Sequence, residues 1–392
     1  MKKLDKELST FYRGLIIVHP YGTYIRKKRK TIIVKTKFMP SIVNKIFLLI
    51  ENKRGLGFIV LGRPTKINLS EFAKLTKYHL IGESHRLDWW PKHATFYSYP
   101  ITNTKFFRIP LLLEYPRGPQ ITIRPSNIFI KKIFVGISGY YYPQIYPRGV
   151  KDMLEFYTKN FNSVEINSTF YKFPSDSLVK KLEKYNLIYT FKVHRYITHT
   201  KRLKKIKHFW KTFYEKLKPL HHKIVCFLFQ FNLSFKYNRE NFERLQSLSR
   251  WLNPLHRYAF EFRDLGWMEN FSVQKLFEKN GWTLVISHLT NANSWTGKLA
   301  SGFNPPLEKY RPTSDTIYIR MHGSLGRYIG SYSNRELRSV VRFMGNTPCK
   351  YIIIYFNNTD SNRDAFNNAL TLKNKVNYLN LSLNTIYPII FS

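Results

Sequence analysis

Cysteine, acidic residues and long apolar runs are all scarce in this sequence of 392 residues. The two cysteines, Cys226 and Cys349, are too few for a disulfide framework or a cysteine-ligated zinc site. The opening stretch MKKLDKELSTFYRG lacks the apolar segment of a secretory signal, and no apolar run approaches the roughly 20 residues that cross a bilayer. We therefore expect a cytoplasmic protein with no membrane partner.

The shortage of acidic residues leaves a strongly basic chain. Asp and Glu number 24 against 64 Lys and Arg, which gives a formal net charge of +40. Hydrophobic residues make up 43% of the chain, which is enough for a folded core and excludes global disorder. The charge favours an anionic partner, either a small molecule or RNA or DNA. The alternative is that an AT-rich coding composition, visible in the abundant Lys, Ile, Asn, Tyr and Phe, is the source of much of this charge.

The rhythm of the sequence changes near residue 127. Before it, short strand-like runs lie close together, at residues 31–37, 45–51, 55–62, 96–101 and 120–125. One helical stretch, residues 68–81, opens with Asn68 as a candidate N-cap and Glu71 three positions later. Several short strands, one helix and frequent Pro and Gly predict a small, mainly β barrel domain over residues 1–127.

From residue 131 onward, strand-like runs alternate with helical patterns. The runs lie at residues 133–138, 163–168, 189–194, 224–230, 258–263, 283–288, 316–323 and 351–358. This alternation indicates βαβ units, and its count and length predict a TIM-like (β/α)8 barrel over residues 131–392, in the α/β class. A doubly wound open sheet is the competing architecture, but no Gly-rich phosphate turn follows the first strand.

Nearly every one of these strands begins apolar and ends polar on a single face. The residues that share this face near the strand ends are Gly136, Ser138, Glu165, Asn167, Lys192, His194, Gln230, Glu261, Arg263, His288, Arg320, His322, Tyr355 and Asn357. In a parallel barrel these ends converge where active sites form, and unpaired burial of such groups is costly. The alternative is that Glu261–Arg263 and Glu165–Arg320 are ion pairs that only hold the strand ends together.

Catalytic and binding roles follow from side-chain chemistry. Glu165 or Glu261 could act as a general base and His322 as a proton shuttle, while Arg263 and Arg320 could clamp a phosphate or carboxylate. A metal site at Glu165, Glu261 and His322 is disfavoured because the two arginines oppose cation binding. No cofactor is implied, and HExxH, Walker and GxSxG motifs are absent from the sequence.

Residues 131–375 resemble the YecE-like proteins, a TIM-barrel family known as domain of unknown function 72. The matching stretches include FVGISGYYYPQIYP (134–147), FNSVEINSTFYKFPS (161–175), EFRDLGW (261–267), YIRMHG (318–323) and YFNNTDSNRDAFNNA (355–369). The resemblance implies a polar pocket at the barrel mouth and no particular reaction. The further pocket residues it implies are Asn167, Thr169, Tyr171, His199, Gln230, Trp267, Asn357 and Asn358.

The chain departs from the family pattern at the third strand of the barrel. The family usually has a lysine at the end of this strand, where His194 stands here. An imidazole that titrates near neutral pH would then replace a permanently charged amine. We therefore include His194 among the ligand-binding candidates and expect altered chemistry if the family lysine contacts an anion or acts as a base.

Residues 15–127 resemble, more weakly, the PUA-like and ASCH-like β-barrels associated with RNA. Residues 1–130 hold 24 Lys and Arg against 7 Asp and Glu, a denser positive charge than in the rest of the chain. The predicted nucleic-acid contacts are Arg26, Lys27, Lys28, Arg29, Lys30, Arg86, Trp89, Trp90 and Lys92, with the two tryptophans as a stacking platform. The alternative is that one tryptophan is a core residue and the basic run is a solvated turn.

Two functional hypotheses result. In the first, the barrel is an enzyme, of hydrolase or other acid–base type, that acts on a phosphorylated or nucleic-acid-related substrate. In the second, the protein binds RNA without catalysis, and the barrel is a ligand-sensing or structural body.

Overall fold

The computed structural model describes residues 11–115, 122–125, 128–290, 297, 299–360 and 363–378. These residues separate into two compact units that divide between Lys131 and Lys132. Within this part of the chain, no helix combines the length and the apolar character that a bilayer crossing requires.

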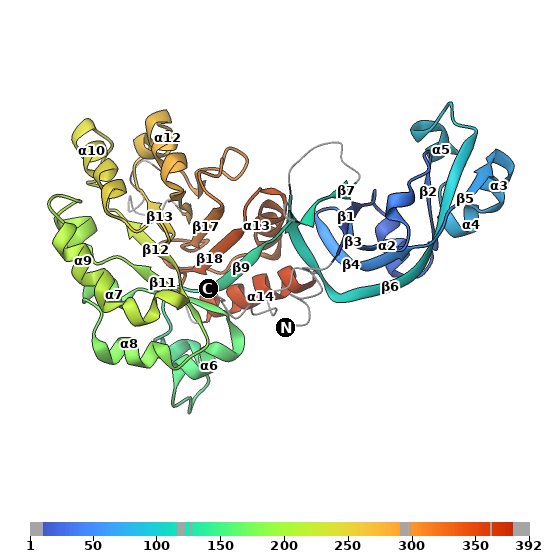
Figure 1. Ribbon diagram of the computed structural model, residues 1–392. Helices are drawn as coiled ribbons and strands as arrows, with labels where there is room; N and C mark the ends of the chain where they lie inside the picture. Colours follow the sequence, from blue (N-terminus) through green and yellow to red (C-terminus); the bar gives the residue numbers. More distant parts are fainter. Residues whose placement is uncertain are drawn as a thin grey trace. The chain divides into compact units, whose positions relative to one another are not determined.

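The first unit is built on one twisted sheet with short helices beside it (Figure 1). Its strands are β1 (Arg13–Ile16), β2 (Ile32–Lys35), β3 (Ile46–Glu51), β4 (Arg54–Leu61), β5 (Thr65–Asn68), β6 (Thr95–Glu114), β7 (Thr122–Ile123) and β8 (Phe129–Ile130). Its helices are α2 (Tyr21–Arg26), the 3-10 turn η1 (Pro40–Ile42), α3 (Leu69–Lys74), α4 (Thr76–His79) and α5 (Glu83–Trp89). The strand order is β2-β6-β4-β3-β1-β7, and β5 and β8 also pair with β6. Only β1 and β3 pair in parallel among these strands.

The predicted helix start at Asn68 is confirmed. The Asn68 side chain accepts a hydrogen bond from the backbone nitrogen of Glu71 at 2.9 Å, and the Glu71 carboxylate accepts one from the backbone nitrogen of Asn68 at 2.8 Å. This reciprocal arrangement satisfies two donors that the first turn of α3 would otherwise leave open. The predicted single helix is divided at Leu75 into α3 and α4.

The second unit has a mixed α/β fold in which parallel strands alternate with helices. Its strands are β9 (Lys132–Ile137), β10 (Ser163–Ile166), β11 (Ile188–Lys192), β12 (Ile224–Gln230), β13 (Tyr258–Glu261), β14 (Thr283–Leu284), β15 (Ile286–Leu289), β16 (Gly302–Asn304), β17 (Thr316–Met321) and β18 (Tyr351–Phe356). Its helices are α6 (Met153–Asn160), α7 (Ser168–Tyr171), α8 (Asp176–Glu183), α9 (Lys207–Lys216), α10 (Arg239–Ser247), α11 (Leu265–Met268), α12 (Phe271–Asn280), α13 (Asn334–Asn346) and α14 (Asp364–Tyr378). Short helical turns complete it: η3 (Pro143–Ile145), the π-helix η4 (Tyr196–Thr200), η5 (Lys218–Lys223) and η6 (Leu248–Arg250).

The parallel strands form two sheets of five strands. One has the order β10-β11-β12-β13-β14, and the other has the order β16-β15-β17-β18-β9. All pairs are parallel except β15 with the short β16. A single parallel bridge between Ser138 and Glu165 connects the end of β9 to β10. Figure 1 shows α9, α10 and α12 on the outer side of β11, β12 and β13.

The strands approach one another most closely where β9 meets β10. A Cβ atom on Gly136 would lie 2.0 Å from the backbone oxygen of Ser163 and 2.4 Å from the hydroxyl of Tyr157. Only glycine permits this approach, which brings the polar end of β10 next to β9.

Side chains from both parallel sheets pack together in one buried cluster. This cluster joins Val225, Cys226, Leu228, Ala259, Val285, Tyr318, Ile353 and Tyr355. The hydroxyl of Tyr355 is hydrogen-bonded to those of Ser163 and Thr190. The interior therefore becomes polar toward the carboxyl ends of the strands, where the candidate site lies.

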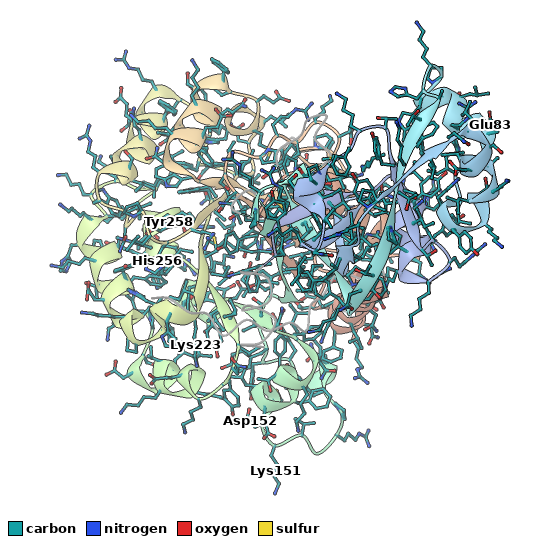
Figure 2. All side chains as sticks on the ribbon, turned by 45° about the vertical axis from the view of Figure 1, so that its right-hand side comes forward. Glu83, Lys151, Asp152, Lys223, His256 and Tyr258 are labelled. Carbon is teal, nitrogen blue, oxygen red and sulfur yellow. The ribbon has the colours of Figure 1, made fainter. Side chains whose placement is uncertain are left out.

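The amino-terminal ends of the same strands have a different character. Lys223 precedes β12, and His256 and Tyr258 lie at the start of β13, as labelled in Figure 2. The Tyr258 hydroxyl donates to the backbone oxygen of Asn253 at 2.9 Å, and the His256 ring lies 5.5 Å from that of Tyr214. These contacts fasten loops to helices, so we interpret this end of the strands as structural.

Candidate active site at the carboxyl ends of the parallel strands

Arg320, near the end of β17, lies between two buried carboxylates. Its Nε and Nη2 atoms donate to Oε2 and Oε1 of Glu165 at 3.1 and 2.7 Å, and its Nη1 donates to Oε2 of Glu261 at 2.6 Å. All three side chains are almost completely inaccessible to solvent. Burial lowers the pKa of Arg320, but the two carboxylates hold that pKa well above its ordinary value. The predicted Glu165–Arg320 ion pair is therefore present.

Glu165 accepts two further hydrogen bonds. The hydroxyl of Ser138 donates to its Oε1 at 2.7 Å, and the hydroxyl of Tyr318 donates to its Oε2 at 2.6 Å. With four donors around it, this carboxylate is fully satisfied without a ligand. We therefore find that Glu165 holds Arg320 in place and has no free oxygen that could act as a general base.

Glu261, the last residue of β13, joins a second guanidinium to the cluster. Its Oε1 atom lies 2.5 Å from Nη2 of Arg263 and 3.4 Å from Nε2 of His322. Burial raises the pKa of Glu261, yet Arg320 and Arg263 hold that pKa well below its ordinary range. Glu261 is thus ionised at neutral pH, and the predicted Glu261–Arg263 pair is also present.

His322 follows β17 and connects this cluster to Asn357. The Nδ2 atom of Asn357 donates to Nδ1 of His322 at 3.0 Å, which puts the ring proton on Nε2, facing Glu261. Burial lowers the pKa of His322 to about 3. The ring is therefore neutral near pH 7 and accepts a proton poorly there, which weakens its predicted role as a proton shuttle.

Lys192, the last residue of β11, belongs to the same group of charges. The pKa of Lys192 is lowered to about 7, mainly by burial and also by Arg320 and Arg263, whereas Glu165 and Glu261 oppose this shift. Its Nζ atom lies 4.0 Å from the ring centroid of Phe170. The alternation of β11 puts Lys192 on the inward face, but the sequence analysis selected His194, two residues later, as the site residue.

His199, on the π-helix, lies beside Lys192. Its ring packs edge-on against Phe170 at 4.9 Å, and its Nδ1 is hydrogen-bonded to the hydroxyl of Thr198 at 2.9 Å. Burial lowers the pKa of His199 to about 4, and the nearby Lys192 and Arg195 lower it as well. His199 is therefore a neutral, partly exposed neighbour of the lysine amine.

His194 is held by backbone groups outside the carboxylate cluster. Its Nε2 is 3.2 Å from the oxygen of Tyr171, and its Nδ1 accepts from the nitrogen of Tyr196 at 3.1 Å. The expectation that this imidazole takes the place of the family lysine is not supported, because Lys192 supplies an amine at the end of the same strand. The side chain of Tyr171 is 65% exposed, and its ring packs edge-on against that of Phe170.

Four other predicted ligand contacts form hydrogen bonds with backbone oxygens and so support the fold. The Trp267 indole is fully buried, donates to the oxygen of Phe235 at 2.7 Å and stacks on Phe262. The hydroxyl of Thr169 donates to the oxygen of Lys192 at 2.8 Å. The amide of Asn358 donates to the oxygen of Gly330 at 2.9 Å. The Gln230 amide donates to the neighbouring Phe231 oxygen, although its side chain is partly exposed.

Four buried side-chain oxygens have no hydrogen-bond partner in the described part of the chain. Two of them are Oδ1 of Asn167, just after β10, and Oγ of Ser287, which is in register with Arg320 on the neighbouring β15. Buried polar atoms normally have hydrogen-bond partners. A bound ligand or water could therefore donate hydrogen bonds to these two oxygens, which lie near the charged cluster.

The loop after β17 covers His322. Gly323 has φ = 120°, and a Cβ atom there would lie 2.4 Å from the oxygen of Ile329. Tyr328 adopts φ = 64°, which is rare for a residue with a side chain, and its nitrogen donates to the oxygen of His322 at 2.8 Å. The sequence analysis did not select Tyr328, because no motif marks a residue that is strained by its surroundings.

Among the residues that the structure describes, no group of three or more His, Cys, Asp or Glu could hold a metal ion. The two carboxylates of the predicted metal alternative, Glu165 and Glu261, both bind Arg320. A guanidinium therefore occupies the place between them that a cation would need.

The predicted nucleic-acid contacts in the first unit fall into two groups. The side chains of Lys27, Lys28, Arg29, Trp89 and Lys92 are exposed. Lys30 is 4% exposed and donates to the oxygen of His79, and Arg26 donates to the oxygen of Phe107 at 3.0 Å. The basic run therefore continues into the core instead of lying wholly on the surface.

The predicted tryptophan platform is largely occupied by the unit's own side chains. Trp89 stacks on His85 with ring centroids 5.4 Å apart and meets Tyr21 edge-on. Trp90 packs against Phe96 in the core at 5.5 Å. Arg86 is buried and paired with Glu83. The two tryptophans therefore pack α5 against Tyr21 and Phe96, and the Arg86–Glu83 pair lies within α5 itself. Trp89 remains 37% exposed, so only part of its surface is open for stacking.

Comparisons with known proteins concern mainly the second unit. The family model described as protein of unknown function DUF72 matches residues 134–387. A DUF72 family protein from Thermotoga maritima has 27% identity and a TM-score of 0.54, covering 63% of this chain and 99% of its own. One from Enterococcus faecalis has 23% identity and a TM-score of 0.54, covering 65% of this chain and 99% of its own.

The first unit has only a weak counterpart. An ASCH protein from Zymomonas mobilis matches 26% of this chain and 70% of its own at 10% identity, with a TM-score of 0.23, too low to support an argument. No curated protein matches the chain. The family match spans well over half of the sequence and contains every residue of the carboxylate and guanidinium cluster. The chain therefore belongs to the DUF72 family of proteins of unknown function.

Proposed function

We propose that the second unit is an enzyme that carries out acid–base chemistry on an anionic substrate at the carboxyl ends of its parallel strands. The observation that carries this proposal is the buried cluster of Glu165, Glu261, Arg263 and Arg320 beside Lys192. Taking charges out of water costs several kcal/mol per ion, and an apolar layer of Val, Ile and Leu would stabilise the strands as well or better. The cluster is thus explained more readily by a role in chemistry than by stability.

The roles in this proposal differ from those that the sequence suggested. Glu165 and Glu261 both bind Arg320, so they act as positioning residues. Lys192 is the proton-transfer group, since an amine with a pKa of about 7 can both accept and release a proton at neutral pH. Arg263 pairs with Glu261 and is 7% exposed, whereas Arg320 is 1% exposed, so Arg263 is the guanidinium that an anionic substrate group would approach.

We also propose that the two parallel sheets of this unit form one closed TIM-like barrel. Two observations support closure: the Ser138–Glu165 bridge between β9 and β10, and the interval of only one residue between β14 and β15. The buried cluster around Tyr318 and Tyr355 also draws on strands of both sheets. The buried thiols of Cys226 and Cys349 form no disulfide in the structure, which fits the proposed cytoplasmic location, where cysteines stay reduced.

A thermal-shift screen of oxo acids, sugar phosphates and nucleotides tests the proposed site. Compounds that bind the folded protein should raise its melting temperature. At a ligand concentration of 100 times the dissociation constant, the unfolding free energy should increase by about 2.7 kcal/mol. In a Lys192→Met variant the shift should fall for the same compounds, because one cationic contact is lost. Equal shifts in both proteins for every binding compound would exclude the strand ends as the site.

A second candidate function, RNA binding by the first unit, rests on one specific observation. Lys27, Lys28 and Arg29 are three consecutive exposed cations at the end of α2, and Arg29 lies over the ring of Tyr24. A plot of log binding constant for single-stranded RNA against log salt concentration should have a slope of roughly 0.7 per phosphate contact. Replacing all three residues by Ala should therefore reduce the magnitude of this slope by about 2. A slope that is flat in the unmodified protein would reject this function.

A further inference from the structure

The amine of Lys192 has no hydrogen-bond acceptor within the described residues. Its Nζ atom lies over the ring of Phe170, 4.0 Å from the ring centroid, in a cation–π contact. The side chain is partly exposed, whereas the Phe170 ring is 8% exposed. A small molecule that reached the strand ends would therefore meet an amine that no protein group holds.

Charged groups face this amine from every neighbouring element. Glu165 on β10, Glu261 on β13 and Arg320 on β17 act on it, together with Arg263. His199 lies on the π-helix beside it and is neutral at pH 7. The charges of the two carboxylates and the two guanidinium groups cancel, so the groups around the amine carry no net charge.

We propose that Lys192 is a nucleophile that forms an imine with an aldehyde or ketone that carries a carboxylate or phosphate group. This inference rests on the proposed function, because it assigns the substrate class of the same site. A partly exposed amine that has no hydrogen-bond acceptor among the described residues and lies on an aromatic ring is the geometry that carries it, since nucleophilic lysines are activated by partial removal from water.

The reaction needs no partner beyond substrate and solvent. The lone pair of the neutral amine nitrogen attacks the carbonyl carbon, and the carbonyl electron pair moves to oxygen to give a carbinolamine. That oxygen leaves as water after it takes a proton from solvent and one from nitrogen. The product is an iminium cation, formed from one amine, one carbonyl compound and one proton, with release of one water.

The surrounding charges suit both the substrate and the product. The iminium is cationic, and Glu165 and Glu261 stabilise it as they stabilise the protonated amine. Arg195 contributes positive charge near His199, and Arg327 does so near Arg263. An anionic group on the substrate would be attracted to this outer basic rim.

The experiment traps the imine with sodium cyanoborohydride in the full-length protein. Pyruvate tests the carboxylate-bearing class and glyceraldehyde 3-phosphate the phosphate-bearing class. Peptide mapping by mass spectrometry should locate the reduced adduct on Lys192 with at least one of the two probes. Its rate should be half-maximal near pH 7, following the neutral amine. A Lys192→Arg variant should give no adduct at this peptide.

Lys30 provides a matched internal comparison. Burial lowers its pKa to about 7 as well, but its amine donates to the oxygen of His79 and its side chain is 4% exposed. Lys192 should be labelled at least ten times faster than Lys30. Equal labelling of the two, or no labelling of Lys192 by either probe, would overturn the proposal. If anions still raised the melting temperature in a manner dependent on Lys192, the proposed function would stand and only the covalent step would be wrong.

Discussion

Glu261 lies between two guanidinium groups, and its removal separates the structural from the electrostatic role of the cluster. In a Glu261→Gln variant, Arg320 and Arg263 both lose the carboxylate that they share in this buried site. Breaking such a pair costs about 3–5 kcal/mol. Urea denaturation should detect this loss, whereas Glu278→Gln, which changes an exposed carboxylate on α12, should change the unfolding free energy by no more than about 0.5 kcal/mol.

The same variant has a second, independent readout. Glu261 raises the pKa of Lys192, so its neutral replacement should lower that pKa below about 7. The midpoint of the pH profile for reductive labelling of Lys192 would then move to lower pH. A midpoint that rises, or that stays in place in a folded variant, would show that Glu261 does not act on this amine.

Lys30 makes stability depend on pH in a predictable direction. Its pKa is about 7 in the folded protein and about 10.4 in an unfolded chain, so between these values the unfolded state binds more protons. The unfolding free energy should therefore rise with pH from 7 to 9, by up to about 1.4 kcal/mol per pH unit from this group.

A Lys30→Met variant tests this origin. Urea denaturation at pH 7, 8 and 9 should show a smaller slope in the variant than in the unmodified protein. Lys66→Met, which changes an exposed lysine of the same unit, should leave the slope unchanged. An unchanged slope in the Lys30 variant would mean that the amine is protonated to the same degree in both states.

At the scale of single elements, strand positions followed closely from sequence, whereas side-chain partners did not. Runs of β-branched and aromatic residues marked each of the parallel strands, because buried strands must be apolar. The sequence also identified the polar ends, but it could not show that Glu165 already has four donors or that Trp267 is consumed by packing. Partners across a sheet depend on register, which the local pattern does not contain.

Some elements had no local signal at all. The strand β5 is absent from the strands expected from the sequence, and β6 runs through Pro100 and Pro110, which normally indicate a strand edge or an end. The site residue Lys192 was visible by alternation but was passed over in favour of His194. In both cases the tertiary contacts, and not the local sequence, determine which residues form a strand and which side chain lies in the site.

The contact between β9 and β10 gives a prediction for these elements. In a Gly136→Ala variant the new methyl group would overlap the backbone oxygen of Ser163, so the strands must move apart. We expect a loss of at least about 3 kcal/mol in unfolding free energy, the upper range for overpacking.

Gly345 on α13 is the matched control. A Cβ atom there has no neighbour within 4 Å, and its backbone is helical. Gly345→Ala should raise the unfolding free energy by up to about 1 kcal/mol, because alanine is the better helix former. Tolerance of alanine at Gly136 would contradict the close approach of the two strands.

At the scale of the whole molecule, a net charge of +40 acts against the folded state. Like charges repel more strongly in the compact state, and salt screens them over about 8–10 Å at physiological ionic strength. The melting temperature should therefore rise when NaCl is increased from about 0.05 to 0.5 M, by about 2–4 °C per kcal/mol of relieved repulsion. The rise should be the same with KCl, and a fall in both salts would show that attractive surface pairs outweigh the repulsion.

The thiol of Cys226 lies in the buried cluster between the two parallel sheets, with no exposed surface, and burial raises its pKa. A thiol in this state is shielded from alkylating reagents until the strands separate. Its rate of reaction with iodoacetamide therefore measures how often that interior opens spontaneously. The measurement requires no denaturant, no dye and no knowledge of what the protein binds.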